Sequence, residues 1–212
     1  MTKRLFFILS IIAIALIFAS CGTRSGNNAK QNANTFDEGV VINGVRWATR
    51  NVDAPGTFTE NPEDYGMLFQ WNRRKEWSAT DEDVEGWDNS THSGTAWYAQ
   101  NDPCPQGWRV PTHVELQSLN NAGSIWTRQN NVSGRFFGTA PNQIFLPAAG
   151  FRDRDSGAFY ASGFSGNYWG SSVNNESDAL WYLTFASPNS FVNYFYRSRS
   201  ASANSIRCVA IN

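Results

Sequence analysis

The sequence predicts an α+β domain built mainly of antiparallel strands. Three observations lead to this prediction: an Asn-Gly pair between two β-rich runs, one well-capped helix, and a second half of strands alternating with turns. Strands do not alternate regularly with helices, and no internal repeat is visible, so a parallel α/β sheet is not expected. The 212 residues suit one domain, or at most two small ones.

Composition narrows the class of protein. Only 17% of the residues are charged, while the chain holds 9 Trp and 17 Gly, which argues against both a disordered chain and a long helical rod. The formal net charge of −1 lacks the basic excess that phosphate binding needs, so nucleic acid is not expected as a partner.

The N-terminus has the pattern of an export signal. Lys3 and Arg4 precede an apolar run over residues 5–19, which is shorter than the roughly 20 residues of a membrane-spanning helix. The following Cys21, after Phe-Ala-Ser, resembles the bacterial lipobox. We therefore predict a lipoprotein signal peptide over residues 1–20 and lipidation of Cys21. Ordinary signal cleavage that leaves Cys21 as a thiol, and a retained anchor helix, are the alternatives.

A polar segment follows the predicted lipidation site. Residues 21–38 are rich in Asn, Ser, Gly, Ala and Gln, and such a composition buries too little surface to fold, so a flexible tether is predicted. The folded domain is then expected over residues 39–212. Its location would be a membrane of the bacterial cell envelope, with the outer membrane favoured.

The first part of the domain is expected to hold short strands and loops. Two β-rich runs over residues 40–47 are joined by Asn43-Gly44, a typical type I′ hairpin turn. Residues 66–71 are predicted to form a short buried strand, and residues 79–93 a polar loop.

One helix is expected over residues 111–119. Thr112 is a suitable N-cap, and Glu115, three residues later, completes a capping box. Leu116 and Leu119 lie on one face of this helix, and residues 121–123 are expected to end it.

The second half is expected to be antiparallel sheet. Strands are predicted over residues 144–151, 179–186, 191–197 and 205–211, with turns at 153–157 and 187–190. Cys104 and Cys208 remain once Cys21 is lipidated, and an exported, oxidising setting favours a disulfide between them. Two buried free thiols are the alternative.

Several separated motifs together resemble one family. Residues 102–112, with Glu115 and Leu116, are similar to the signature of the Fibrobacter succinogenes major paralogous domain family. Further matches occur in the same order at residues 42–48, 66–71, 146–151, 168–172 and 205–209. The resemblance covers about residues 40 to 212 and implies a C-type-lectin-like fold, which formylglycine-generating enzymes and many microbial adhesins share. It does not imply one activity.

Metal and catalytic motifs are weak. The Glu-Pro-Asn, Gln-Pro-Asp and Trp-Asn-Asp triplets of calcium-dependent lectins do not occur in the chain. The acidic run that starts at Asp81 has His92 where an EF-hand loop needs Glu, and His92 and His113 lack metal-ligand spacing. Residues 163–166 fall short of a serine nucleophile elbow. We therefore expect no metal, no cofactor and no catalytic residue.

Aromatic side chains near the C-terminus are the candidate ligand-binding residues. In the strand over residues 179–186, alternation places Trp181, Leu183 and Phe185 on one face and Leu180, Tyr182 and Thr184 on the other, so both faces carry aromatic groups. We expect one face of the sheet to be solvated, which exposes some of these aromatics, and we expect Leu183 and Phe185 to lie in the core. The alternative is that the aromatic residues are simply core. Tyr, Trp and Arg are typical of recognition surfaces. The predicted binding residues are Trp181, Tyr182, Phe191, Tyr194, Tyr196, Arg197 and Arg199.

These observations favour a lipid-anchored envelope protein or adhesin that is not an enzyme and that binds a protein or a glycan through its C-terminal aromatic face. A structural component of an envelope or pilus-like assembly is one alternative. An enzyme of the formylglycine-generating architecture is the other, although the sequence shows no redox cysteine pair for it.

Overall fold

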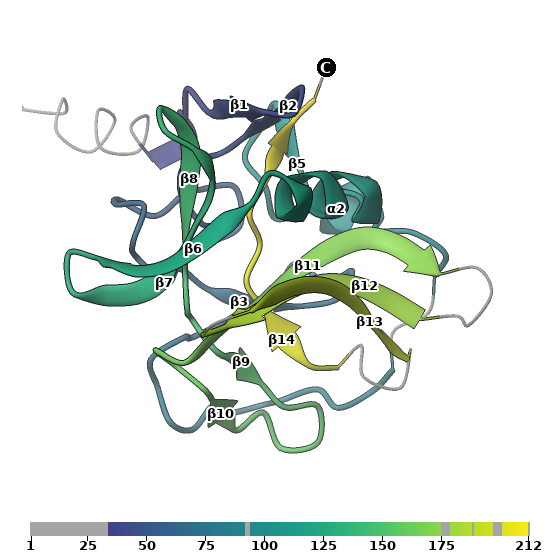
Figure 1. Ribbon diagram of the computed structural model, residues 1–212. Coiled ribbons are helices and arrows are strands. Elements are labelled where there is room, and N and C mark those ends of the chain that lie inside the picture. The colour runs from purple at the N-terminus through teal and green to yellow at the C-terminus, as the bar shows by residue number, and fades with distance from the viewer. Residues whose placement is uncertain (1–33, 92–93, 175–178, 188, 197–200, 212) are drawn as a thin grey trace, which may run out of the picture.

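The computed structural model describes residues 34–91, 94–174, 179–187, 189–196 and 201–211, with the side chains of 192–196 outside the description (Figure 1). Over these residues the chain is a mainly-β fold with one short α-helix, α2 (His113–Asn121), and a 3-10 helix, η1 (Ala99–Asn101). The predicted dominance of antiparallel strands is confirmed. The predicted signal peptide and Cys21 lie outside the described residues.

The strands form four small sheets, within which all pairings are antiparallel. The first sheet has the order β1 (Val40–Ile42), β2 (Val45–Trp47), β15 (Val209–Ala210) and β5 (Trp108–Arg109). The second has the order β10 (Phe159–Tyr160), β9 (Phe151–Arg152), β14 (Ala203–Asn204), β3 (Leu68–Gln70) and β4 (Glu76–Trp77). The third contains β11 (Ser165–Asn174), β12 (Ala179–Ala186) and β13 (Ser190–Tyr196), and the fourth contains β6 (Ser124–Gln129), β7 (Val132–Thr139) and β8 (Asn142–Pro147).

The predicted N-terminal hairpin is confirmed. β1 pairs with β2, and the connecting Asn43 and Gly44 have φ values of 49° and 82°. Both values lie in the left-handed region that a type I′ turn requires and that Asn and Gly tolerate. The predicted strand at residues 66–71 is also present, as the fully buried β3.

The helix begins and ends close to the predicted positions. Thr112 is the N-cap, and its hydroxyl accepts a hydrogen bond from the backbone N–H of Glu115, whose carboxylate accepts one from the Thr112 N–H. Burial raises the pKa of Glu115, but hydrogen bonds from Arg109 and Thr112 outweigh it and hold that pKa below its ordinary value. The capping box therefore fixes the start of α2.

Replacing Thr112 by alanine is expected to lower the free energy of unfolding by about 1 kcal/mol, because it removes the acceptor for an otherwise unpaired helix N–H. Urea denaturation of the full chain would measure this change. Thr112→Ser retains the oxygen and should remain within a few tenths of a kcal/mol of the unmodified protein. Equal losses in the two variants would contradict a role for the hydroxyl.

The predicted strand over residues 144–151 is interrupted, because residues 144–147 belong to β8 and residue 151 begins β9. The strands β6 and β7, which form a three-stranded meander with β8, and the long strand β11 were not predicted from the sequence. In the meander, Asn130 and Asn131 form the first turn with φ values of 45° and 67°, so this Asn-Asn pair was an available hairpin signal. β11 is rich in Gly, Ser and Asn, which have low strand propensity. Pairing with β12 along most of its length stabilises it instead.

The predicted final strand over residues 205–211 was too long. β14 pairs with β3 and β9 in one sheet, whereas β15 pairs with β2 and β5 in another. The intervening residues 205–208 are buried while they cross between the two sheets, so they belong to the core without forming part of a continuous strand.

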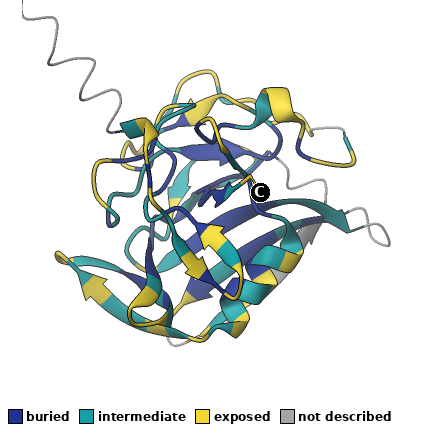
Figure 2. Ribbon diagram, turned by 90° about the horizontal axis from the view of Figure 1, so that it is seen from above, coloured by how far each residue is buried: buried dark blue, intermediate teal, exposed yellow. Residues whose placement is uncertain are grey.

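The sheet of β11, β12 and β13 lies under α2 and is buried at β12 on both faces (Figures 1 and 2). On one face, Leu183 and Phe185 join a cluster that includes the inward side of α2. On the other face, Leu180 and Tyr182 join a second cluster that contains three buried tryptophans. The expectation of a solvated face at this strand is therefore wrong.

Arg207 is fully buried where the segments 48–51, β8 and β11 meet. Its guanidinium donates to the Asn51 side-chain oxygen at 2.7 and 3.0 Å and to the carbonyls of Ala48 and Phe145 at 3.2 and 3.0 Å. Burial lowers the pKa of Arg207 to about 10 and raises the pKa of the neighbouring Tyr168 to about 12.

The predicted disulfide is confirmed. Cys104, just before β5, is bonded to Cys208, just before β15, across a separation of 104 residues. Both cysteines belong to the same buried cluster as Leu180 and Tyr182. The bond therefore joins the segment that leads into α2 to the C-terminal segment.

The last residues of the predicted tether pack on the domain. Asp37 is buried, forms an ion pair with Arg50 at 3.3 Å and accepts hydrogen bonds from Thr49. The Asn34 carbonyl accepts a hydrogen bond from the Phe58 N–H at 2.6 Å. Folded contacts thus begin a few residues before the predicted boundary at residue 39, because Asp37 finds a charge partner there. Across the described residues, the structure has no helix with the length and apolar character needed to span a bilayer.

Candidate ligand-binding groove

The structure divides the predicted binding residues among different surroundings. Tyr182 is only 6% exposed and belongs to the core, so its prediction as a surface residue is wrong. Phe191 is 50% exposed at the start of β13, and Trp181 is half-buried on the α2 side of β12. The side chains of Tyr194 and Tyr196, and all of Arg197 and Arg199, lie outside the described residues.

The physical reason for the Tyr182 error is the position of its strand. β12 lies between β11 and β13, and residues that alternate along it meet a packed cluster on either face. An aromatic residue on an interior strand covered on both faces is core, whereas the prediction assumed a sheet with one wet face.

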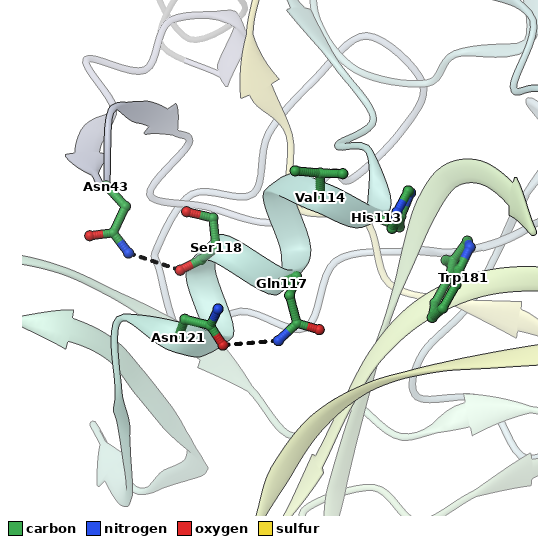
Figure 3. Close-up of a pocket in the computed structure, with 7 residues that line it drawn as sticks. All are labelled: Asn43, His113, Val114, Gln117, Ser118, Asn121 and Trp181. Atoms are coloured by element: carbon green, nitrogen blue, oxygen red, sulfur yellow. Dashed lines mark hydrogen bonds between the residues drawn. The ribbon is translucent and has the colours of Figure 1, made fainter.

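An open groove of about 500 Å³ runs along the outer side of α2 toward β12 (Figure 3). Its wall is formed by the turn between β1 and β2, by one side of α2 and by the start of β12. The lining residues are Asn43, His113, Val114, Gln117, Ser118, Asn121 and Trp181.

An aromatic pair forms one end of the groove. The rings of His113 and Trp181 stack with centroids 5.0 Å apart and an interplanar angle of 19°. The backbone N–H of His113 donates a hydrogen bond to the Ser172 hydroxyl of β11 at 3.2 Å, which joins the first turn of α2 to the sheet. His113 Nδ1 is buried and has no hydrogen-bond partner among the described residues. The pair therefore combines a flat apolar surface with an unused polar atom.

Three side-chain amides occupy the rest of the groove. Asn43 donates from Nδ2 to the Ser118 carbonyl at 2.9 Å, which joins the N-terminal hairpin to α2. Gln117 donates from Nε2 to Asn121 Oδ1 at 2.9 Å, one helical turn away. These bonds orient the amides, and all three side chains remain exposed.

The groove carries little charge. None of its described lining residues is Asp, Glu, Lys or Arg. Such a surface suits an uncharged polar ligand better than an ion, because an ionic ligand would lose hydration without gaining a charge partner.

Sequence reasoning identified Trp181 but missed the helical part of the site. His113, Val114, Gln117, Ser118 and Asn121 recur at the spacing of one helix face, opposite to the face of Leu116 and Leu119. This polar face was visible in the sequence. Its proximity to Asn43 and Trp181 was not, because those residues are far away along the chain.

Two other hollows differ in chemistry. One is lined by Asp53, Glu60 and Asp64, and burial together with the charges of Asp64 and Glu76 raises the pKa of Asp53. The other is lined by Trp97, Trp108 and Cys104, one of the two disulfide cysteines. Within the described parts of the chain, no group of three or more His, Cys, Asp and Glu side chains is arranged to hold a metal ion.

Comparison with known proteins finds no matching family model, no matching curated protein and no matching solved structure.

Proposed function

We propose that the protein is a lipid-anchored binding protein of the bacterial cell envelope, that it is not an enzyme, and that its ligand, a protein or a glycan, occupies the groove between α2 and β12. The observation that carries this proposal is the His113–Trp181 stack at one end of a groove otherwise lined by oriented amides. Concave sites that combine an aromatic surface with a few placed polar groups are typical of ligand binding.

The proposed anchor rests on the lipobox-like residues before Cys21. The domain itself we propose to be a C-type-lectin-like member of the Fibrobacter succinogenes major paralogous domain family. The order of the quoted motifs, the disulfide and the single capped helix before a strand-rich second half support that assignment. The fold by itself does not specify the ligand, so the functional proposal stands on the groove.

The groove also accounts for part of the predicted aromatic surface. In the register of the third sheet, Tyr194 of β13 lies directly opposite Trp181 of β12, and Tyr196 lies opposite Ala179. Directly opposite residues of antiparallel strands are close neighbours. We therefore include Tyr194 in the proposed binding surface and place Tyr182 outside it.

Binding of the full chain, solubilised in detergent, to arrays of glycans and of proteins tests this function. We expect binding that persists in EDTA and that falls at least tenfold in Trp181→Ala, because the aromatic surface is lost. Ile125→Ala is the matched control, since Ile125 is an exposed apolar residue on β6 outside the groove. Equal binding by the two variants would overturn the groove as the binding site, and a loss of assembly in place of binding would favour the structural alternative.

A further inference from the structure

We infer that the ligand of this groove is an uncharged saccharide that stacks on the His113–Trp181 pair and is held by the amides of Asn43, Gln117 and Asn121. The inference rests on the proposed function and specifies its ligand class. It is independent of calcium, since it uses side chains of α2, β12 and the N-terminal hairpin and no metal ligand.

The absence of charged side chains from the described lining favours a neutral ligand. A sialylated, sulfated or phosphorylated ligand needs a cation, and none of the described lining residues is Lys or Arg. A cationic ligand needs a carboxylate, which the described lining also lacks. The polar atoms that are present belong to amides, a hydroxyl and an imidazole, and these bind neutral groups without a desolvation penalty for a buried charge.

The stacked rings of His113 and Trp181 offer a flat surface for a sugar ring. Sugar rings have one face made largely of C–H groups, and this face packs on flat aromatic surfaces through dispersion and the negative charge of the ring face. Trp181 is half-buried and fixed by its stack with His113, so little side-chain entropy is lost when a ring packs beside it.

The side-chain amides of the groove match the hydroxyl groups of a sugar. Each amide side chain has both donor and acceptor atoms, and each sugar hydroxyl both donates and accepts. Gln117 and Asn121 are already joined by one hydrogen bond, and Asn43 is held to the backbone of α2 by another. The groove thus presents oriented donors and acceptors before a ligand arrives.

The same groove is poorly suited to a peptide. Extended peptides bind by adding to a free strand edge, but β12 is an interior strand, paired on both sides. Helical peptides need a continuous apolar groove, whereas the apolar lining here consists of Val114 beside the aromatic pair. A saccharide can contact both the aromatic surface and the amides, so it fits this groove better than a peptide does.

Isothermal titration of the full chain in detergent with three probe sets tests the inference. The sets are neutral oligosaccharides of glucose, galactose, mannose and N-acetylglucosamine, the same oligosaccharides carrying sialic acid or sulfate, and uncharged peptides of similar size. We expect neutral oligosaccharides to bind, and charged ones to bind no better than their neutral parents.

Variants then locate the bound sugar. Trp181→Ala should weaken binding by roughly tenfold or more, whereas Trp181→Phe should restore it to within about threefold, because a flat ring is retained. Gln117→Ala should weaken it by about three- to tenfold through a lost hydrogen bond. Arg128→Ala, an exposed change on β6, is the control, and thermal melting checks that each variant is folded.

The outcomes separate the two proposals. Peptide binding that is lost in Trp181→Ala, without sugar binding, would overturn the saccharide and leave the groove as the binding site. Tight binding of the charged sugars alone would also overturn an uncharged ligand. If no probe depends on Trp181, both the saccharide and the groove are overturned.

Discussion

Removal of the Cys104–Cys208 disulfide is expected to lower the free energy of unfolding by about 4 to 5 kcal/mol, which is a large part of the stability of a typical domain. The bond closes a loop across 104 residues, so its main effect is to restrict the unfolded chain. Both cysteines are buried in one apolar cluster, so replacing them by alanine also removes packing contacts.

Urea denaturation of Cys104→Ala/Cys208→Ala, compared with the unmodified protein with and without dithiothreitol, measures this effect. The reduced protein retains both sulfur atoms and separates loss of the cross-link from loss of packing. Cys21→Ala should leave the midpoint unchanged, because Cys21 is not part of the bond. An unaltered urea midpoint after complete reduction would show that the cross-link does not stabilise the fold.

Replacing Arg207 by methionine is expected to cost about 3 to 5 kcal/mol of unfolding free energy, because each of three buried acceptors that loses its donor costs about 1 to 3 kcal/mol. Methionine fills a similar volume but leaves the Asn51 side-chain oxygen and the carbonyls of Ala48 and Phe145 buried without a donor. Asn51 also donates to the Tyr168 hydroxyl at 3.2 Å, so the loss extends to the buried polar network. These acceptors come from two separate segments, residues 48–51 and β8, which Arg207 joins to the C-terminal segment.

Chemical denaturation of Arg207→Met beside Arg128→Met tests the role of this guanidinium. Arg128 is exposed on β6, and its replacement should change the unfolding free energy by less than about 0.5 kcal/mol. Arg207→Lys should be nearly as damaging as Arg207→Met, because an ammonium group does not reproduce the planar fork that reaches three acceptors. A cost below about 1 kcal/mol for Arg207→Met would mean that water satisfies these acceptors.

Local chemistry was readable from the sequence. The Asn43-Gly44 turn and the Thr112–Glu115 capping box each involve residues within a few positions of one another, and the structure places both as predicted. Their hydrogen bonds close without help from the rest of the fold. The bounds of β12 at residues 179–186 were also predicted correctly, from its alternating pattern, although its hydrogen bonds depend on β11 and β13.

The groove required the tertiary structure. Asn43, α2 and Trp181 are separated by dozens of residues, and no periodicity relates the hairpin turn to the strand. Sequence reasoning gave Trp181 a surface role from its residue type alone, and the same reasoning failed for Tyr182, its neighbour. The two residues differ because they point to opposite faces of β12. Tyr182 packs in a buried cluster, whereas Trp181 lines the groove beside α2.

The turns, the helix cap and the mainly antiparallel strands could be predicted from the sequence, because short-range hydrogen bonds and side-chain periodicity encode them. The number of cysteines likewise left one pair available for a disulfide. The tertiary structure alone decided that β12 is covered on both faces, that residues 205–208 cross between two sheets, and that an aromatic pair meets three amides beside α2. Those features depend on non-local packing, where burial is set by whichever segment arrives from elsewhere in the chain.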